Sequence, residues 1–420
     1  KEAVYMAGSI VVNVDYSFDE IEIPGCATCF SMDINFQNIK KLILNRPSQK
    51  LLKDIKTFAL DQIKVCGLEK DSMKDLCYIL SRKNCSSIEV SKSIDYKSMN
   101  GILYNKNGSQ LIKCPAKKAG TINIPEGVTH ISDDAFYDSD IEKVILPDSV
   151  QKIGRGAFGH CQKLKEVVFG NGLTEMSNRA FMYDQELENI NLPDSLTDLA
   201  EYVFFGCAKL TAVNLPKNLR KIDDYAFFAC PIKKLVLPES LVSADHNSLI
   251  NTEKIVIKDK PTFYVKNFFF AISSDEEFIT TQGRYTEIEQ GERHYFIPKT
   301  MPLLHIQSLG IKYEDIKDFG WFTFYKYGAN SIDRYNTALA EYYNSPSMLT
   351  DSYIRKFAKT IAKELVKNNQ EKDLVKFLKE DFLTKKARNE ILKLCIDKDM
   401  PIAVAYILET QKKNTKKISL

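Results

Sequence analysis

The sequence predicts an α+β protein, in which a solenoid with a curved parallel sheet is followed by a C-terminal α-helical domain. Three observations lead to this prediction. A 22- or 23-residue repeat runs through the middle of the chain, each copy contains a short apolar–x–apolar strand pattern, and the hydrophobic period becomes helical after residue 351. A repeating unit of this length cannot bury its own apolar face, so stacked copies must share a core.

The repeat is clearest in its aromatic and proline positions. Five segments align without gaps and carry the same Phe, with steps of 22, 23, 23 and 23 residues: Phe136, Phe158, Phe181, Phe204 and Phe227. A proline keeps the same spacing, with Gly170 in the one slot that lacks it: Pro125, Pro147, Pro193, Pro216 and Pro238. This constant spacing predicts one coil per copy.

Each copy opens with a strand that one proline ends. In one copy Leu187, Ile190 and Leu192 alternate with polar residues before Pro193. Alternation indicates a strand with one buried face, and proline ends it because it cannot donate to the ladder. One further slot holds Cys161, Cys207 and Cys230, which we interpret as small buried hydrophobic residues.

The unit resembles the BspA-like leucine-rich repeat family of bacteria, over residues 87 to about 258. Residues 98–121 resemble the hairpin insert that often precedes the regular repeats in that family. Asn107-Gly108 predicts a type I′ turn between Ile102–Tyr104 and Leu111–Lys113. The resemblance implies a leucine-rich-repeat solenoid that serves in adhesion or as an interaction module.

Less regular copies precede the insert. Four short apolar pairs, at steps of 21, 21 and 25 residues, predict further strands: Ile21/Ile23, Leu42/Leu44, Ile63/Val65 and Ile88/Val90. The predicted solenoid therefore covers residues 1–260, with degenerate copies in 1–90 and regular repeats in 122–258. Residues 261–345 are rich in aromatic side chains and predict a cap or linker region, since an open terminal coil needs covering.

Residues 346–420 predict a domain of helices. Ile354, Phe357, Ile361 and Leu365 share one helical face, and Asn368-Asn369 ends that helix. Two further helices are centred on Leu374 to Leu378 and on Ile391 to Leu394, and a fourth starts at Met400-Pro401. From residue 351 on there are 17 basic and 10 acidic residues, interspersed as on a solvated helical surface.

Two short motifs suggest a protein kinase, and the repeat argues against that reading. Gly154, Gly156 and Gly159 fill G-x-G-x-x-G, and Asp318-Phe319-Gly320 spells DFG. A phosphate-binding loop needs its glycines so that the backbone can approach the phosphate. Because sister copies carry Ser132 or Tyr202 in the same slots, we interpret the glycines as incidental, and no His-Arg-Asp tripeptide occurs.

No other catalytic, metal or cofactor motif stands out, so we expect no enzyme activity and no cofactor. None of the five histidines lies in H-E-x-x-H or has a partner at metal-ligand spacing. Cys26 and Cys29 form a C-x-x-C that lacks the second pair of a zinc ribbon. The pairs Asp133-Asp134 and Asp223-Asp224 fall at one repeated turn, where we expect them to cap main-chain groups.

The exposed strand face of the repeats remains as the candidate site. In each strand the middle residue and the residue two before it point away from the core, so stacking turns them into rows. We expect these rows to bind a protein partner: Asn123, Lys143, Ile145, Glu166, Val168, Asn189, Asn191, Asn214, Lys234 and Val236. The alternative is that β-branched residues stand there only because they favour strands.

The sequence leaves two other functions open. One is a cell-surface adhesion or carbohydrate-binding protein that uses aromatic residues such as Trp321 and Tyr325. The other is an enzyme in which His294, His305 and Asp318 meet in a pocket.

The net charge, hydropathy and cysteine content of the chain limit the possible partners and locations. A net charge of +3 is too small to indicate nucleic acid, and no apolar run reaches the ~18 residues of a membrane span. Ten cysteines without a visible signal favour the cytoplasm over the cell surface or secretion, and no oligomeric state follows from the sequence.

Overall fold

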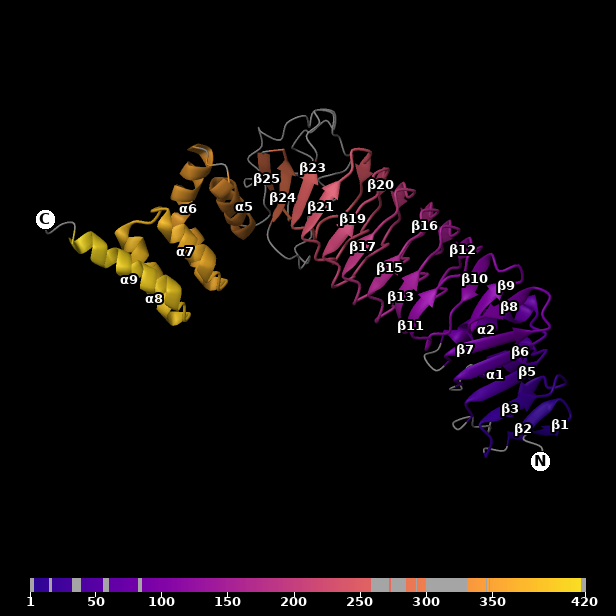
Figure 1. Ribbon diagram of the computed structural model, residues 1–420. Coiled ribbons are helices and arrows are strands. Elements are labelled where there is room, and N and C mark those ends of the chain that lie inside the picture. The colour runs from indigo at the N-terminus through magenta and orange to yellow at the C-terminus, as the bar shows by residue number, and fades with distance from the viewer. Residues whose placement is uncertain are drawn as a thin grey trace. The chain divides into compact units, whose positions relative to one another are not determined.

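The computed structural model of the chain (Figure 1) divides into two compact units, Lys1–Ile272 and Ser273–Leu420. The structure describes residues 4–14, 17–31, 39–55, 60–81, 85–257, 272, 285–291, 293–299, 331–344, 346 and 348–416. The first unit is the predicted solenoid, and the second contains a hairpin and helices.

Four parallel strands form the sheet of the N-terminal coils: β3 (Glu20–Ile23), β5 (Lys41–Asn45), β6 (Gln62–Cys66) and β7 (Ser87–Ser91). Their apolar residues are in register, with Ile21 opposite Leu42 and Leu42 opposite Ile63. All three side chains are buried. The degenerate repeats therefore form coils, because each strand buries one face against its neighbours.

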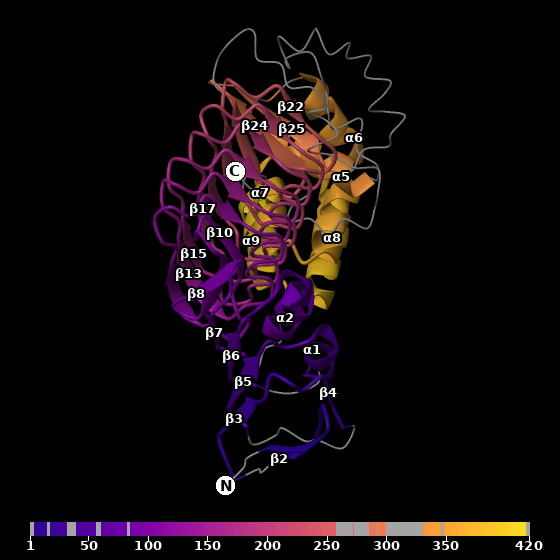
Figure 2. The same cartoon turned by 90° about the vertical axis from the view of Figure 1, so that its right-hand side faces the viewer.

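Helices and a small sheet complete these coils. Figure 2 shows α1 (Gln49–Ile55) and α2 (Met73–Leu80) across the coils from β5 and β6. A 3₁₀ turn (Lys70–Ser72) precedes α2. Strands β1 (Val4–Ala7) and β2 (Ile10–Val14) are antiparallel, and β4 (Cys29–Phe30) runs parallel to β2. Both helices pack apolar side chains into the core that the strands share.

A pair of hairpins separates the N-terminal coils from the regular ones: β8 (Tyr96–Met99), β9 (Ile102–Asn105) and β10 (Gln110–Lys113), each antiparallel to the next. The predicted type I′ turn at Asn107-Gly108 is wrong. Four residues separate β9 from β10, and of that pair Gly108 alone has a left-handed backbone. The Asn105 side-chain oxygen accepts hydrogen bonds of 3.0 Å from the N–H groups of Gly108 and Gln110, which holds the wider loop.

The two-residue turn lies one hairpin earlier. Asn100 and Gly101 have φ angles of 51° and 74° and connect β8 to β9, whose Met99 and Ile102 are paired. Two consecutive left-handed residues are the conformation of a type I′ turn.

Each regular coil contributes to two sets of parallel strands. The first set comprises β11 (Gly120–Asn123), β13 (Ile141–Ile145), β15 (Glu166–Val168), β17 (Asn189–Asn191), β19 (Ala212–Asn214), β21 (Lys234–Leu237) and β23 (Lys254–Ile257). The second comprises β12 (His130–Ile131), β14 (Lys152–Ile153), β16 (Glu175–Met176), β18 (Asp198–Leu199), β20 (Lys221–Ile222) and β22 (Ser243–Ala244). Every pair of neighbours is one repeat apart, as the spacing predicts.

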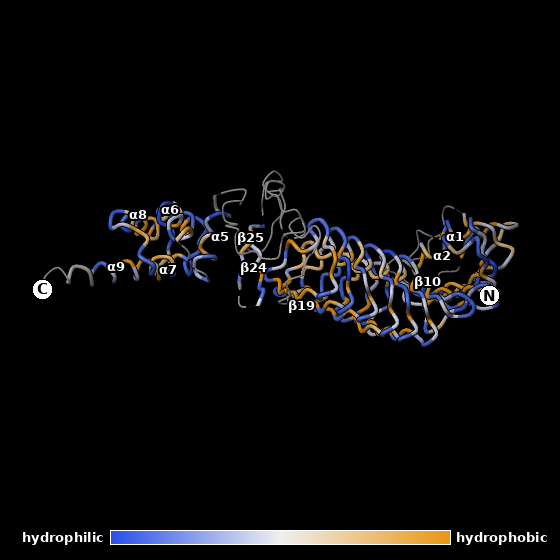
Figure 3. The backbone as a smooth tube through the Cα atoms, turned by 90° about the horizontal axis from the view of Figure 1, so that it is seen from above, coloured by the Kyte–Doolittle hydropathy of each residue, from blue (hydrophilic) through white to orange (hydrophobic). Residues whose placement is uncertain are grey.

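A column of phenylalanines fills the core between these strands. The rings of Phe136, Phe158, Phe181, Phe204 and Phe227 are buried, and successive centroids lie 4.8 to 5.5 Å apart with nearly parallel planes. Figure 3 shows apolar segments recurring from coil to coil. Stacked rings contribute about 0.5–1.5 kcal/mol per pair beyond their burial, so the column links each coil to the next.

The repeated cysteines lie beside this column and are buried, as predicted. They are also hydrogen-bond donors. The thiols of Cys161, Cys207 and Cys230 donate to main-chain oxygens of the preceding coil, at 3.1, 3.1 and 2.9 Å. A small side chain with a weak donor therefore suits this slot better than an aliphatic one.

The second unit begins, in its described part, with an antiparallel hairpin of β24 (Tyr285–Gln290) and β25 (Arg293–Pro298). Five helices follow: α5 (Ser331–Asn344), α6 (Met348–Lys367), α7 (Glu371–Lys379), α8 (Lys385–Asp397) and α9 (Pro401–Lys416). The four predicted helices correspond to α6 to α9, and their apolar faces share one core. Asn369, with φ of 56°, ends the run of α6, and Pro401 opens α9.

Helix α5 was not predicted from the sequence. It contacts α6 and β25, and Tyr335 and Leu339 join the helical core. Within the part of the chain that the structure describes, no helix is long and apolar enough to cross a membrane.

Candidate binding surface

The ten residues predicted to bind a partner lie on one set of strands, β11 to β21. We call the outward side chains of these strands the strand face. Lys143 and Ile145 are half-buried and the other eight are exposed: Asn123, Glu166, Val168, Asn189, Asn191, Asn214, Lys234 and Val236. The inward neighbours of these residues are buried, for example Val144, Ile190 and Leu235. Alternation along each strand thus separates the face from the core.

Rows form on the strand face because neighbouring strands are in register. Asn123 lies opposite Ile145 and Ile145 opposite Val168. Asn191 lies opposite Asn214, and the Asn214 side-chain amide donates a hydrogen bond to the Asn191 side-chain oxygen. The face therefore mixes aliphatic side chains with amides that already bond along the row.

Charge on the strand face is partly neutralised within the rows. Lys143 and Glu166 are opposite one another, and Lys143 Nζ lies 2.8 Å from a Glu166 carboxylate oxygen. An exposed ion pair of this kind contributes about 0–1 kcal/mol to stability, so it does not explain why the positions are charged. Lys234 instead lies opposite Lys254 of β23, so two lysines are neighbours at this end of the face.

A hollow of about 500 Å³ opens at the carboxyl ends of β19 and β21. Three of the predicted residues line it: Asn214, Lys234 and Val236. Leu237, at the end of β21, and the residues that follow the two strands complete the wall, namely Leu215, Lys217, Pro238 and Glu239. Val236 is 45% exposed, a large value for a β-branched apolar side chain. These post-strand residues were not predicted from the sequence, although the repeated proline marks where each strand ends.

The glycines of the G-x-G-x-x-G stretch serve the packing of the coils. Gly156 has φ of 60°, and the same slot is left-handed at Asp134, Arg179 and Tyr202, so the backbone conformation belongs to the repeat. A side chain at Gly154 would place its Cβ 2.5 Å from the main-chain nitrogen of Asp133. The interpretation of Gly154 as incidental is therefore wrong, because the preceding coil leaves no room there for a side chain.

One carboxylate of each Asp-Asp pair caps a main-chain group. An Asp133 carboxylate oxygen accepts a 2.8 Å hydrogen bond from the Arg155 N–H, one coil further on. Asp224 accepts the equivalent bond from the His246 N–H at 2.8 Å. Each carboxylate thus satisfies a donor at the turn of the next coil.

The cysteines offer little nucleophilic chemistry. All ten are free thiols, with Cys26 of the C-x-x-C pair exposed and Cys29 buried. Burial raises the pKa of the Cys77 thiol to about 11 and that of the Cys85 thiol to about 12. Since the thiolate is the reactive form, a raised pKa makes these thiols unreactive at neutral pH.

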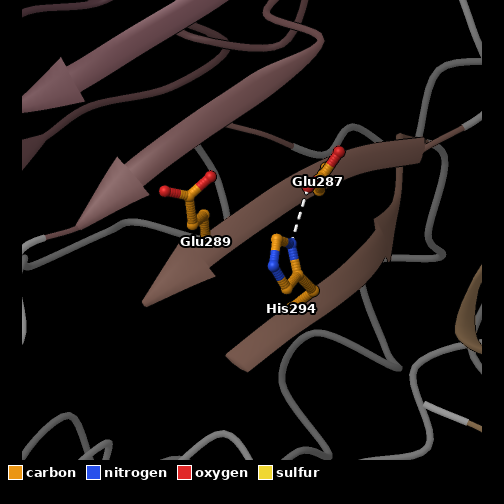
Figure 4. A group of neighbouring side chains, drawn as sticks. All are labelled: Glu287, Glu289 and His294. Carbon is orange, nitrogen blue, oxygen red and sulfur yellow. Dashed lines mark hydrogen bonds and ion pairs between the residues drawn. The ribbon is translucent and has the colours of Figure 1, made fainter. Parts of the chain in front are cut away.

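One group in the second unit could ligate a metal. His294 on β25 lies with its Nδ1 2.8 Å from a Glu287 carboxylate oxygen of β24, and Glu289 brings a third ligand atom within 4.8 Å of the others (Figure 4). Carboxylate and imidazole ligands suit ions such as Zn²⁺ or Mn²⁺. No short motif in the sequence marks this group, because pairing across the hairpin assembles it.

The other residues of the two rival functions lie outside the described part of the chain: His305, Asp318 with the DFG tripeptide, Trp321 and Tyr325.

Solved structures of bacterial repeat proteins resemble part of this chain. A leucine-rich repeat protein from Eubacterium ventriosum is 16% identical, with a TM-score of 0.39 over 62% of this chain and 94% of its own. The pneumococcal vaccine antigen PcpA is 20% identical, with a TM-score of 0.35 over 58% of this chain and 64% of its own. A leucine rich cell surface protein from Faecalibacterium prausnitzii is 20% identical, with a TM-score of 0.36 over 65% and 60%.

The repeat sequence itself matches a described family. Residues 129–256 and 174–291 match the BspA type leucine rich repeat region, in six copies. A comparison with curated proteins found no match. The matched residues include all the regular coils from β12 on, with their phenylalanine column and repeated prolines. The regular coils of this solenoid thus form a BspA type leucine-rich repeat region, which spans residues 129–291.

Proposed function

We propose that this chain is a non-catalytic protein-binding module whose partner lies on the strand face. Repeats of this family typically mediate interactions or surface binding. The observation that carries the proposal is the hollow at β19 and β21, because three predicted residues line it and Val236 exposes its side chain there.

The composition of the strand face suits a protein partner. Interfaces concentrate their binding energy in a few side chains that fill desolvated pockets, with polar groups at the rim. Here Val236 supplies apolar surface in the hollow, while Asn191 and Asn214 supply donors and acceptors beside it. Such a surface fits a partner that inserts an aliphatic or aromatic side chain and pairs its main chain with the amides.

The lysines at the hollow indicate the charge of the partner. Lys234 lines the hollow and lies opposite Lys254, whereas Lys217 in the same lining is already paired with Asp194 at 3.2 Å. We therefore expect an acidic side chain on the partner close to the one that enters the hollow.

Affinity capture tests the proposal. The baits are the wild-type chain, the double variant Asn191→Arg/Asn214→Arg and the control Thr174→Arg/Thr197→Arg. The first variant adds bulk and charge in the middle of the strand face. The control makes the same change at two exposed positions of neighbouring coils, each just before a strand of the second set. A partner kept by the wild type and the control but lost by the first variant supports the proposal.

A partner that all three baits retain equally would place binding elsewhere on the chain. Retention by the strand-face variant together with loss by the control would assign it to the second set of strands. Either result overturns the strand face as the site.

We also infer that the module acts in the cytoplasm. The supporting observation is that all ten thiols are free and that most are buried, which suits a reducing compartment. Fractionation of cells with an antibody to the chain tests this inference, and recovery from the surface fraction would contradict it.

A further inference from the structure

A second hollow, of about 540 Å³, lies where α2, β10 and the first regular coils meet. It lies away from the strand face, and none of the ten strand-face residues lines it. Its polar lining comes from four separate stretches of chain and includes Cys77, Gln110, Lys113, His130, Asp134 and Lys152. A pocket of this size with convergent polar groups is typical of a small-molecule site.

Lys113 is the unusual member of this lining. Its side chain is 3% exposed, although lysine is almost never fully buried without a partner of opposite charge. Its Nζ donates a 2.5 Å hydrogen bond to the main-chain oxygen of Asp134, which is a neutral acceptor. Among the residues that the structure describes, Lys113 forms no ion pair within 4.0 Å.

Lys113 is buried because it lies at the junction between the N-terminal coils and the regular coils. Lys113 lies two residues beyond Leu111, which pairs with Ile131 of the first regular coil. Two residues beyond Ile131 and Ile153, the equivalent positions are Asp133 and Arg155, and both are exposed. Around Lys113, helix α2 contributes Cys77, Tyr78 and Ser81 to the wall of the hollow. Solvent is replaced there by a helix that the regular coils lack.

The protonated amine is destabilised in this position. Burial lowers the pKa of Lys113, against the smaller opposing influence of Cys77 and Asp134. Burial also raises the pKa of the Cys77 thiol to about 11, so this neighbour is neutral at pH 7 and supplies no counter-charge. A neutral lysine amine carries a free electron pair and is a nucleophile.

We propose that this hollow binds a small molecule with an aldehyde or ketone group, and that Lys113 Nζ joins it as an imine. The nitrogen electron pair forms a bond to the carbonyl carbon. The carbonyl oxygen then takes up both amine hydrogens and leaves as water, so that amine plus carbonyl compound gives imine plus water. Nothing is oxidised or reduced, and hydrolysis reverses the step.

The lining favours a neutral carbonyl compound over an anion. Asp133 and Asp134 line the same hollow and would repel a carboxylate or phosphate. Lys152 also lines it, but its Nζ lies 2.6 Å from a Glu175 carboxylate oxygen, so its charge is already paired. His130 Nδ1 lies 2.7 Å from the Thr129 hydroxyl, which occupies that ring nitrogen.

Reductive trapping tests the proposal on the full wild-type chain. The probe is acetaldehyde at limiting concentration with cyanoborohydride at pH 7, and peptide mass spectrometry reports the ethylation of each lysine. The matched comparison is Lys106, an exposed lysine in the loop that connects β9 to β10. We expect Lys113 to be labelled several-fold faster than Lys106, since a lowered pKa raises the neutral, nucleophilic fraction of an amine.

Two controls assign the effect to the folded hollow. In 8 M urea the two lysines should react at equal rates, because the difference between them comes from folding. The variant Lys113→Met should remove the fast-reacting site and leave Lys106 unchanged. Labelling of Lys113 at or below the rate of Lys106 in the folded wild type would overturn the proposal, and this result does not depend on whether the variant folds.

Discussion

The carboxyl group of Asp184 accepts a 2.8 Å hydrogen bond from the main-chain N–H of Cys161, one coil earlier in the solenoid. Asp184 is fully buried and occupies the slot that holds Ser139, Cys161, Cys207 and Cys230 in the other coils. Its second oxygen has no hydrogen-bond partner among the described residues. A carboxyl group thus replaces a thiol in the core, with half of its polar atoms unsatisfied.

The first prediction is that Asp184→Cys stabilises the protein at neutral pH. Burial, with a further contribution from Cys207, raises the pKa of Asp184 well above its ordinary value, so the folded state keeps the proton that the unfolded state loses above about pH 4. The unfolding free energy of the wild type is therefore highest below about pH 4, and it falls as the pH rises toward the raised pKa of Asp184. We expect the variant to gain about 1–3 kcal/mol at pH 7 and less at pH 4, measured by urea unfolding.

A surface change controls for this effect. Asp198→Asn alters an exposed carboxylate of the next coil and should change the unfolding free energy by less than about 0.5 kcal/mol. Equal stability of wild type and Asp184→Cys across the pH range would show that the Asp184 carboxyl is not destabilising.

The second prediction concerns the phenylalanine column. Phe181 stacks on Phe158 and Phe204 at 4.9 and 5.5 Å and meets the edge of Phe169, so its removal leaves a cavity at the middle of the solenoid. We expect Phe181→Ala to lower the unfolding free energy by about 3–5 kcal/mol, and Phe181→Leu by clearly less. Chemical unfolding followed by circular dichroism measures both. A loss below about 1 kcal/mol for the alanine variant would mean that the column does not hold the coils together.

The third prediction concerns Gly170, which occupies the slot that holds proline in the other regular repeats. A Cβ added at Gly170 would lie 2.4 Å from the main-chain carbon of Pro147 and 2.5 Å from the nitrogen of Asp148. We expect Gly170→Ala to cost about 1–3 kcal/mol, because main-chain atoms of the preceding coil must shift. Thermal unfolding measures the loss.

Gly127→Ala is the matched control for this contact. Gly127 has φ of 87° and no atom within 4 Å of the added Cβ, so this variant carries backbone strain alone, about 1–2 kcal/mol. If Gly170→Ala leaves the melting temperature unchanged while Gly127→Ala lowers it, close approach of the coils is not the reason for glycine at 170.

The regular coils were predictable because their period is strict. The spacing of Phe136 to Phe227 fixes the register, and the register fixes which strand residues face outward, so all ten strand-face positions could be named from the sequence. The same repeat spacing places Asp184 at the position of the buried cysteines, so its burial could also have been predicted from the sequence. In both cases a local repeat determines the environment of the residue.

Other features could not be predicted, because they depend on contacts that the repeat spacing does not determine. Burial of Lys113 requires α2, which precedes it by more than thirty residues and has no counterpart in the regular coils. The Glu287, Glu289 and His294 group requires the pairing of β24 with β25. The loop after Asn105 takes four residues because a side-chain oxygen satisfies two main-chain donors, which competes with the two-residue turn that Asn-Gly favours.

The last prediction concerns a cap shared between two helices of the second unit. A Glu371 carboxylate oxygen, on α7, accepts hydrogen bonds from the N–H groups of Ile402 and Ala403 in the first turn of α9, at 2.7 and 3.0 Å. These donors have no partner within their own helix, and a negative charge at this end also favours the helix dipole. We expect Glu371→Ala to destabilise α9 locally by about 1–2 kcal/mol. Hydrogen exchange of the α9 amides in the full chain measures the effect, as faster exchange at Ile402 and Ala403. Glu371→Gln keeps an acceptor oxygen and should restore most of the protection, so equal exchange in the two variants would attribute the effect to charge and contradict the hydrogen-bonded cap.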